Sequence, residues 1–480
     1  MFYIIFGLIG AVTLAIILRR WQHGVLLLVL SLPFTGAIIL WTKGSALTIL
    51  AKDILIVLPL YISFALRGFP LGTGRLPASL VLPILALTLI VLLQMGNPSI
   101  AGLAVALVGA KTWLFYIPLL AITAALLRSD EDLTRLLRSM VVLVPVPCVV
   151  GLVQYFASSA YGHEDAITAF YGADAAAAAT QGFSSFDYGG TLYRLPSTFV
   201  SVAHYFGYIE HSLVPAYAVL RCDPSKAWRR YAVMVILLLI AAGFLSGARS
   251  AFIFVPLLLV LILVIDRVIV GAMTWVAIIP ALFVTVLGLA GIDPLVVFQQ
   301  VQDLAQLNAK GLVLRSMIDA MRDYPLGLGT GMSTIAARHV LGADSQLVLF
   351  ESQFAKTVAE LGLIGLAALL AVFVATLVLA WRGRQATAGL RWGSAGAAFA
   401  AYYIVMPLHA LKGWPLDWEP ANIYFWMFAA MGVMLPRLSQ RIPQAPRATL
   451  QQLWLSARAA RRGQAASRPV SAPGRLRPSL

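Results

Sequence analysis

A polar stretch of about 60 residues, from Gly291 to Ser352, interrupts a chain that is otherwise a series of apolar runs. It contains a turn rich in glycine, Tyr324 to Gly331, and then several ionisable residues, namely Arg338, His339, Asp344 and Glu351. Glu351 is the first candidate for a catalytic base because it stands where this stretch meets the next apolar run, and His339 is the second. A pure scaffold has little use for such groups beside lipid, so the stretch is the candidate catalytic loop.

Arginines at the ends of apolar runs form a second group. Arg194 precedes one run, Arg249 lies in the small-residue break Ser246–Ser250 between two others, and Arg315 lies in the polar stretch. A guanidinium group stays protonated and can hold a phosphate through two parallel hydrogen bonds. We therefore predict that these arginines bind a diphosphate. The competing interpretation is that they only reach toward lipid headgroups.

One apolar run carries His204, Glu210 and His211. An ionisable side chain inside a bilayer usually marks a pathway or a site, so His204 and Glu210 are candidate supporting residues. Alternatively, Glu210 and His211 bond to each other in the bundle interior. In the polar stretch, Tyr324, Gly327 and Gly329 are further supporting candidates, because glycine permits a close backbone turn.

These groups must be positioned by membrane helices. The chain has 480 residues, of which 60% are hydrophobic and 11% charged, and its mean hydropathy is +0.87. Apolar runs of about 17–25 residues cross a bilayer as helices, because lipid offers no partner to an open backbone amide. The sequence predicts an all-α, polytopic transmembrane bundle of about 12–13 spans. Thirteen runs are found, near 2–18, 25–41, 53–66, 78–95, 110–127, 140–158, 201–220, 231–246, 250–265, 270–290, 353–380, 393–411 and 421–435.

The polar stretch itself should be helical. Asp293-Pro294 is a helix cap followed by proline at the first helical position. Apolar residues then recur at helical spacing from Val297 to Met321, with Arg315 on the polar side. We expect amphipathic helices at the interface or over the bundle.

The Lys and Arg residues indicate which loops face the cytoplasm. If 19–24 and every second loop after it are cytoplasmic, those loops and the tail hold 24 of the 35 basic residues, and the N-terminus is outside. The segments are then N-terminal spans (1–158), an outer loop (159–200), central spans (201–290), the outer catalytic loop (291–352), C-terminal spans (353–435) and a cytoplasmic tail (436–480). The tail holds nine arginines and no acid, and is predicted to be disordered.

Charge and cysteine content exclude other classes. The net charge of +15 comes largely from the tail and the cytoplasmic loops, so it is not the footprint of a nucleic-acid groove. Cys148 lies in a span and Cys222 in a cytoplasmic loop, which leaves no disulfide or metal site to be built from them. Neither a cofactor nor a metal is expected.

The order of these features resembles the O-antigen ligase and O-antigen polymerase superfamily, which are membrane glycosyltransferases. The similar pieces are Arg194 with the following LPSTF, the Ser246–Ser250 turn, Arg315 ahead of the glycine-rich turn, and Glu351 followed by 359–365 (AELGLIG). They cover about residues 190–370. In the ligases a His-Asn pair stands nine residues before the glutamate of the last motif. Here that position holds Glu351-Ser352, since the glutamate is Glu360.

The departure favours a polymerase, or a transferase of another surface polysaccharide such as a capsule or exopolysaccharide, over a ligase. The resemblance implies a polyprenyl-diphosphate-linked glycan donor, a glycan or lipid-linked acceptor, and contact with membrane lipid and with chain-length or export proteins. It further implies a bacterial cytoplasmic membrane, a site facing the exterior, and metal-independent inverting displacement. Glu360 is expected to be structural. A secondary transporter or lipid-linked glycan flippase, with Glu210 and the histidines as a relay, is the alternative from another class, and a structural assembly protein is the third.

Overall fold

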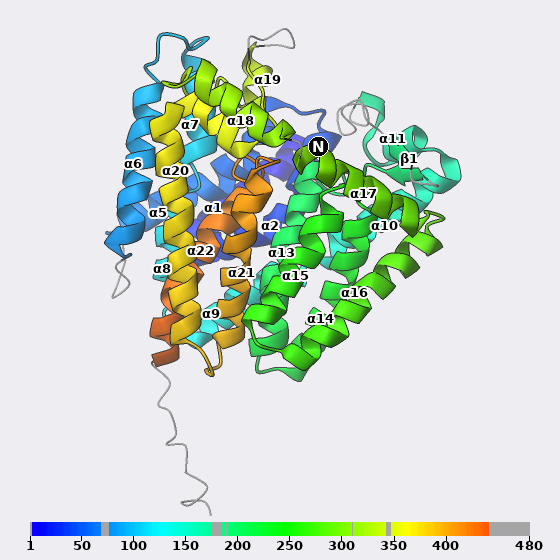
Figure 1. The fold of residues 1–480 in the computed structure, drawn as a ribbon. Helices are drawn as coiled ribbons and strands as arrows, with labels where there is room; N and C mark the ends of the chain where they lie inside the picture. Colours follow the sequence, from blue (N-terminus) through cyan, green and yellow to red (C-terminus); the bar gives the residue numbers. More distant parts are fainter. Residues whose placement is uncertain are drawn as a thin grey trace, which may run out of the picture. The chain divides into compact units, whose positions relative to one another are not determined.

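The computed structural model describes residues 2–68, 76–174, 185–187, 191–309, 311–341 and 347–440. Residues 1–439 belong to one compact unit. Within the described part, helices dominate, and the strands are two short antiparallel ones, β1 (Ser185–Asp187) and β2 (Thr191–Tyr193). The predicted all-α transmembrane bundle is confirmed (Figure 1).

The first group of helices is formed by the N-terminal part of the chain. Its members are α1 (Phe2–Arg19), α2 (Trp21–Ser31), α3 (Thr35–Trp41), α4 (Ala46–Lys52), α5 (Leu58–Leu66), α6 (Ala78–Gln94), α7 (Leu103–Leu114), α8 (Pro118–Leu126), α9 (Asp130–Val142), α10 (Pro145–Tyr161) and α11 (His163–Tyr171). A π-helical turn, η2 (Asp53–Val57), joins α4 to α5.

The second group begins after β2. Its members are α13 (Val202–Cys222), α14 (Lys226–Leu245), α15 (Ala251–Ile265), α16 (Ile269–Leu289), α17 (Pro294–Ala309), α18 (Leu312–Asp323), α19 (Arg338–Leu341), α20 (Gln353–Ala386), α21 (Gly393–Ala410) and α22 (Ala421–Gln440). The predicted cap is present, because the Asp293 carboxylate accepts from the amide of Leu295 at 2.8 Å. The amphipathic helices expected in the polar stretch are α17 and α18.

The number of spans differs from the number of apolar runs. In the described residues, six helical segments are long and apolar enough to cross a membrane, or seven if the bent pair Ala277–Leu289 and Pro294–Gln302 counts as one. Three further apolar helices are shorter, among them α6 and α15. The helix α13 is long enough, but its histidines, tyrosines and Glu210 make it less apolar than the six. The chain is a multi-pass membrane protein.

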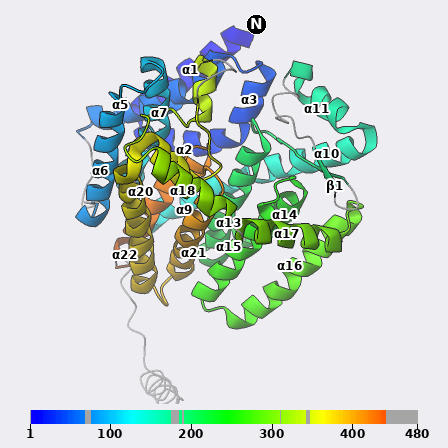
Figure 2. The same ribbon diagram turned by 45° about the horizontal axis from the view of Figure 1, so that its top comes forward.

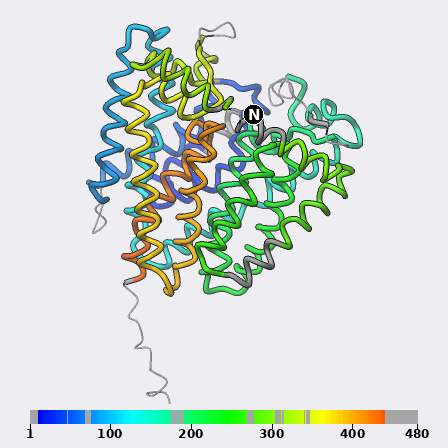
Figure 3. The backbone as a smooth tube through the Cα atoms, viewed as in Figure 1, coloured from blue at the N-terminus to red at the C-terminus, as the bar shows by residue number. Residues whose placement is uncertain are grey.

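Successive helices bring distant loops to one end of the bundle (Figures 1 and 2). The helix α13 runs away from this end and α14 returns to it. In the same way, α20 runs away from this end and α21 returns to it, and these two helices lie side by side (Figure 3). We call this end, formed by 191–201, 246–250, 324–341, 347–352 and 411–420, the loop end. Two of its segments are joined where the amide of Gln353, directly after 347–352, donates to the carbonyl of Gly413 at 2.9 Å.

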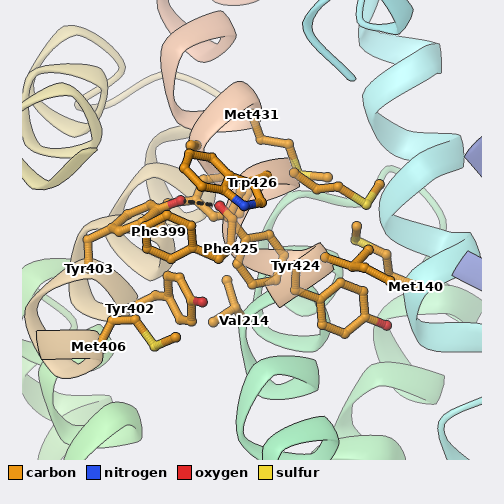
Figure 4. Packing of buried hydrophobic residues seen from close by; sticks show 14 of the residues in the cluster. Met140, Val214, Phe399, Tyr402, Tyr403, Met406, Tyr424, Phe425, Trp426 and Met431 are labelled. Carbon is orange, nitrogen blue, oxygen red and sulfur yellow. Dashed lines mark hydrogen bonds between the residues drawn. The ribbon is translucent and has the colours of Figure 1, made fainter. Parts of the chain in front are cut away.

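The core lies where α13, α21 and α22 meet. Figure 4 shows large rings from α21 and α22 packed together, with Val214 of α13 and Met140 of α9 beside them, and the hydroxyl of Tyr403 donates to the carbonyl of Phe425 at 2.6 Å. Nearly every residue of α13 is buried. The polar groups of α13 must therefore find partners inside the protein.

The last helix extends beyond the predicted last span. The last span was expected to end at 435, but α22 continues through Pro436 to Gln440. The rest of the predicted tail, 441–480, lies outside the described residues.

Candidate functional site

The loop end brings Arg194 and Arg249 into one region, as the sequence predicts. Arg194 directly follows β2, and Arg249 lies in the turn between α14 and α15. The amide of Leu195 donates to the carbonyl of Ser246 at 3.1 Å. Gly247 has a φ of +76°, and a Cβ atom there would collide with the backbone of Tyr193 and Arg194. The two segments are therefore in direct contact, and only glycine allows this approach.

The electrostatics of the pair suit an anion. Arg194 is half-buried and Arg249 is exposed. Burial, together with the positive charge of Arg249, lowers the pKa of Arg194. A phosphate bound between the two guanidinium groups would relieve this repulsion and could accept forked hydrogen bonds from both.

Arg315 lies on a different element. It is exposed on α18, which packs against α20, whereas Arg194 and Arg249 are carried by the segments around β2 and α15. The third predicted arginine thus lies on the helix that leads into the loop end and not on the segments that form the pair.

The candidate bases both lie at the loop end. Glu351 stands two residues before α20, its side chain is 82% exposed, and its carboxylate lies 3.7 Å from the Lys412 ammonium. An exposed ion pair of this length holds the carboxylate only weakly. His339 is in α19, but its side chain lies outside the described ones.

The glycine-rich turn serves packing. Gly327 has a φ of +82°, and a Cβ atom there would meet the backbone of Glu360 and Gly362. At Gly362 the helix α20 is broken, with a φ of 71°, and the amide of Gly329 donates to the carbonyl of Glu360 at 3.1 Å. Tyr324 packs against Phe350 at a ring distance of 6.4 Å. The predicted supporting residues Tyr324, Gly327 and Gly329 thus seat the turn in the break of α20.

The Glu360 carboxylate locks this arrangement. It accepts hydrogen bonds from the Trp113 indole at 2.7 Å, the Ser333 amide at 2.9 Å and the Thr334 hydroxyl at 2.8 Å. The Glu360 side chain is 0% exposed, and the Lys356 ammonium lies 4.0 Å away. These contacts agree with the structural role expected for Glu360.

The polar residues of α13 do not bond to one another but to other groups. The His409 imidazole on α21 donates to the Glu210 carboxylate at 2.7 Å, while His211 bonds to the carbonyl of Gly207 at 2.7 Å. The expected bond between Glu210 and His211 is therefore wrong, because on a helix adjacent residues point apart. His204 bonds to Ser201 at 2.8 Å, and its ring lies 6.5 Å from that of Trp418.

A buried charge cluster was missed from the sequence. Lys52 pairs with Asp53 at 2.6 Å and with Glu419 at 3.1 Å, and Lys111 lies 2.7 Å from Asp53. The hydroxyl of Tyr116 donates to the Glu419 carboxylate. A signal was present, since Lys52, Asp53 and Lys111 are ionisable residues in or beside apolar runs.

Glu419 and its neighbour Asp417 lie in the segment between the last two helices. Burial by itself would raise the pKa of Glu419, but the Lys52 and Lys111 ammonium groups and the Tyr116 hydroxyl outweigh it and lower this pKa to about 2. For Asp417 burial prevails over its pairing with Lys356, and the pKa is raised. Asp417 is thus a further carboxylate with perturbed acidity at the loop end.

Neither a metal-binding group in the described part of the chain nor a known relative identifies the chemistry of the site. Among the described residues, no group of three His, Cys, Asp or Glu side chains is arranged to hold a metal ion. No protein-family model matches the chain, and no curated protein matches it either. The resemblance to the O-antigen enzymes accordingly rests on the motifs themselves.

Proposed function

We propose that the protein is a membrane glycosyltransferase that polymerises or transfers lipid-diphosphate-linked oligosaccharides on the outer face of a bacterial cytoplasmic membrane. The observation that carries the proposal is the contact between the segments of Arg194 and Arg249 at the loop end. A polyprenyl diphosphate is the anionic leaving group that such a pair would stabilise in a membrane enzyme.

The proposed step is a single displacement. The acceptor hydroxyl attacks the anomeric carbon of the donor sugar, and its proton passes to the Glu351 carboxylate. The bond from the anomeric carbon to the phosphate oxygen breaks, and the diphosphate leaves with the electron pair. Arg194 and Arg249 stabilise the charge that develops on it, and the configuration at the anomeric carbon inverts.

The role of Glu351 can be tested by Glu351→Gln, which keeps size and hydrogen bonding but cannot take a proton. We expect donor binding to be unchanged and turnover to fall by at least about a hundredfold. Binding and single-turnover rates with radiolabelled lipid-linked donor in detergent measure the two effects. Normal turnover in Glu351→Gln together with an inactive His339→Ala would assign the base to His339 instead.

The proposed orientation puts the loop end outside, as the distribution of Lys and Arg indicates. Tyr161 and Leu326 are 76% and 80% exposed, and Ala388 is exposed on the turn between α20 and α21. Cysteines at Tyr161 and Leu326 should react with an impermeant thiol reagent in spheroplasts, and a cysteine at Ala388 should react only after lysis. Both native cysteines are buried, which keeps the background low. Labelling of Ala388→Cys alone in intact spheroplasts would invert the topology.

The material that accumulates in a deletion strain tests the function itself. Single repeat units on lipid would indicate a lost polymerase, the reading favoured by Glu351 in the position where ligases have histidine. Finished lipid-linked polymer would indicate a ligase. Normal polysaccharide on the cell surface would refute the proposal.

A transporter or flippase remains the second candidate because of one observation. The pair of Glu210 and His409 is wholly buried between α13 and α21, where a proton relay could lie. Accumulation of lipid-linked repeat units on the cytoplasmic side of the membrane in the deletion strain would favour this alternative.

A further inference from the structure

The segment between α21 and α22 presents aromatic rings beside carboxylates. Trp414 and Trp418 are both partly exposed, with ring centroids 6.5 Å apart, and Asp417 and Glu419 flank Trp418. We call the four residues Trp414, Asp417, Trp418 and Glu419 the tryptophan shelf. It lies outside the arginine pair and the candidate bases.

The shelf is held by buried charges from separate elements. Asp417 pairs with Lys356 of α20, and Glu419 pairs with Lys52 of α4 at 3.1 Å and with Lys111 of α7 at 3.8 Å. Lys356 is 0% exposed and Lys52 is 8% exposed. Long side chains lose much conformational entropy in such contacts, so a loop that only connects two helices has little need of them. The result is a preorganised surface of two indole rings.

The chemistry of the shelf matches a saccharide. Sugar rings present C–H faces that pack on indole rings, and hydroxyl groups that bond to carboxylates and ammonium groups. Glu419 stays ionised as an acceptor, because the pKa of its carboxyl is lowered to about 2. The indole nitrogen of Trp414 is buried without an acceptor among the described residues, and a hydroxyl oxygen could satisfy it.

Charge balance separates the shelf from the arginine pair. Lys52 and Lys111 are offset one for one by Asp53 and Glu419. Asp417 and Glu360 share Lys356. The surface therefore has no excess positive charge with which to hold a diphosphate. It fits the uncharged sugars of the same substrate.

Packing links the shelf to the helices that begin at the arginine pair. The Trp418 ring lies 6.5 Å from that of His204 in the first turn of α13, which begins eight residues after Arg194. It also lies 5.7 Å from the His409 ring, which stacks on Phe254 in the first turn of α15 at 4.7 Å. The shelf thus adjoins the starts of both helices.

We propose that the tryptophan shelf binds neutral sugar residues of the glycan substrate, with Trp418 as the stacking platform. This inference rests on the proposed glycosyl transfer for its biological meaning, but sugar binding can be measured without turnover. The role of Trp418 is positioning and recognition, since it reaches none of the reacting atoms assigned above.

Saturation-transfer NMR on the detergent-solubilised full chain tests the proposal. The probe is neutral oligosaccharide released by mild acid from the surface polysaccharide of the source strain. We expect saturation of sugar C–H protons with the native protein, loss of at least about tenfold in affinity with Trp418→Ala, and a smaller loss with Trp418→Phe. Trp381→Ala is the matched control, because Trp381 is 41% exposed on α20. The thermal midpoint of each variant verifies folding.

The outcomes separate this inference from the proposed function. Sugar binding that is absent in the native protein, or unchanged in Trp418→Ala, would overturn the shelf even if the protein transfers glycans. Binding that depends on Trp418 in a protein with no transferase activity would support the shelf and refute the proposed function. If Trp418→Ala does not fold, the Phe variant must still bind sugar more weakly than the native protein for the proposal to stand.

Discussion

Replacing Glu360 by alanine is expected to lower the free energy of unfolding by about 3 kcal/mol or more. The change leaves the Trp113 indole, the Ser333 amide and the Thr334 hydroxyl buried without their acceptor, and each such donor costs about 1–3 kcal/mol. Glu360→Gln should lose less, because its amide oxygen can still accept from Ser333 and Thr334. Titration with SDS in mixed micelles measures the difference.

Glu351→Ala is the control for this effect. Both glutamates belong to the same stretch around the start of α20, but the Glu351 side chain is 82% exposed and that of Glu360 is 0% exposed. Glu351→Ala should unfold like the native protein. A Glu360→Ala variant of native stability would show that the turn at Gly327 does not depend on this carboxylate.

Arg249→Ala is expected to reduce glycan transfer from a lipid-diphosphate donor by at least about a hundredfold. Removing one hydrogen-bonding group that stabilises a developing negative charge typically slows a reaction by this factor. Arg249→Lys should lose most of the activity too, because lysine keeps the charge but lacks the planar fork that holds a phosphate bidentately. Polymer formed in a deletion strain that expresses each variant, and single-turnover rates with purified protein, measure the effect.

Stability and a matched arginine distinguish this result from misfolding. Arg249 is exposed, so its variants should remain in the membrane at the normal level. Arg322→Ala removes another exposed arginine, on α18 directly before the loop end, and should keep full activity. Full activity in Arg249→Ala would remove this residue from the diphosphate site.

The sequence by itself determined the class of fold and the local features of the helices. Apolar runs of bilayer length can satisfy their backbone only as helices, so composition and run length were enough to predict an all-α bundle. The Asp293 cap and the amphipathic pattern of α18 were also predictable, because both depend only on residues within a few positions of one another. Thirteen apolar runs were predicted as spans, whereas six helical segments of the described residues, or seven with the bent pair, are both long and apolar enough to cross a membrane, because run length does not show where a helix begins and ends.

For the candidate site, the sequence indicated that Arg194 and Arg249 would share one side, because the ends of successive spans alternate between two faces. It could not indicate partners that are distant in the chain. Glu210 bonds to His409, 199 residues away, and Glu360 to Trp113, 247 residues away. Only the packing of α13 on α21, and of α20 on its neighbours, decides which buried carboxylate meets which donor. A buried charged side chain needs a partner inside the protein, but the amino-acid sequence does not show which residue that partner is.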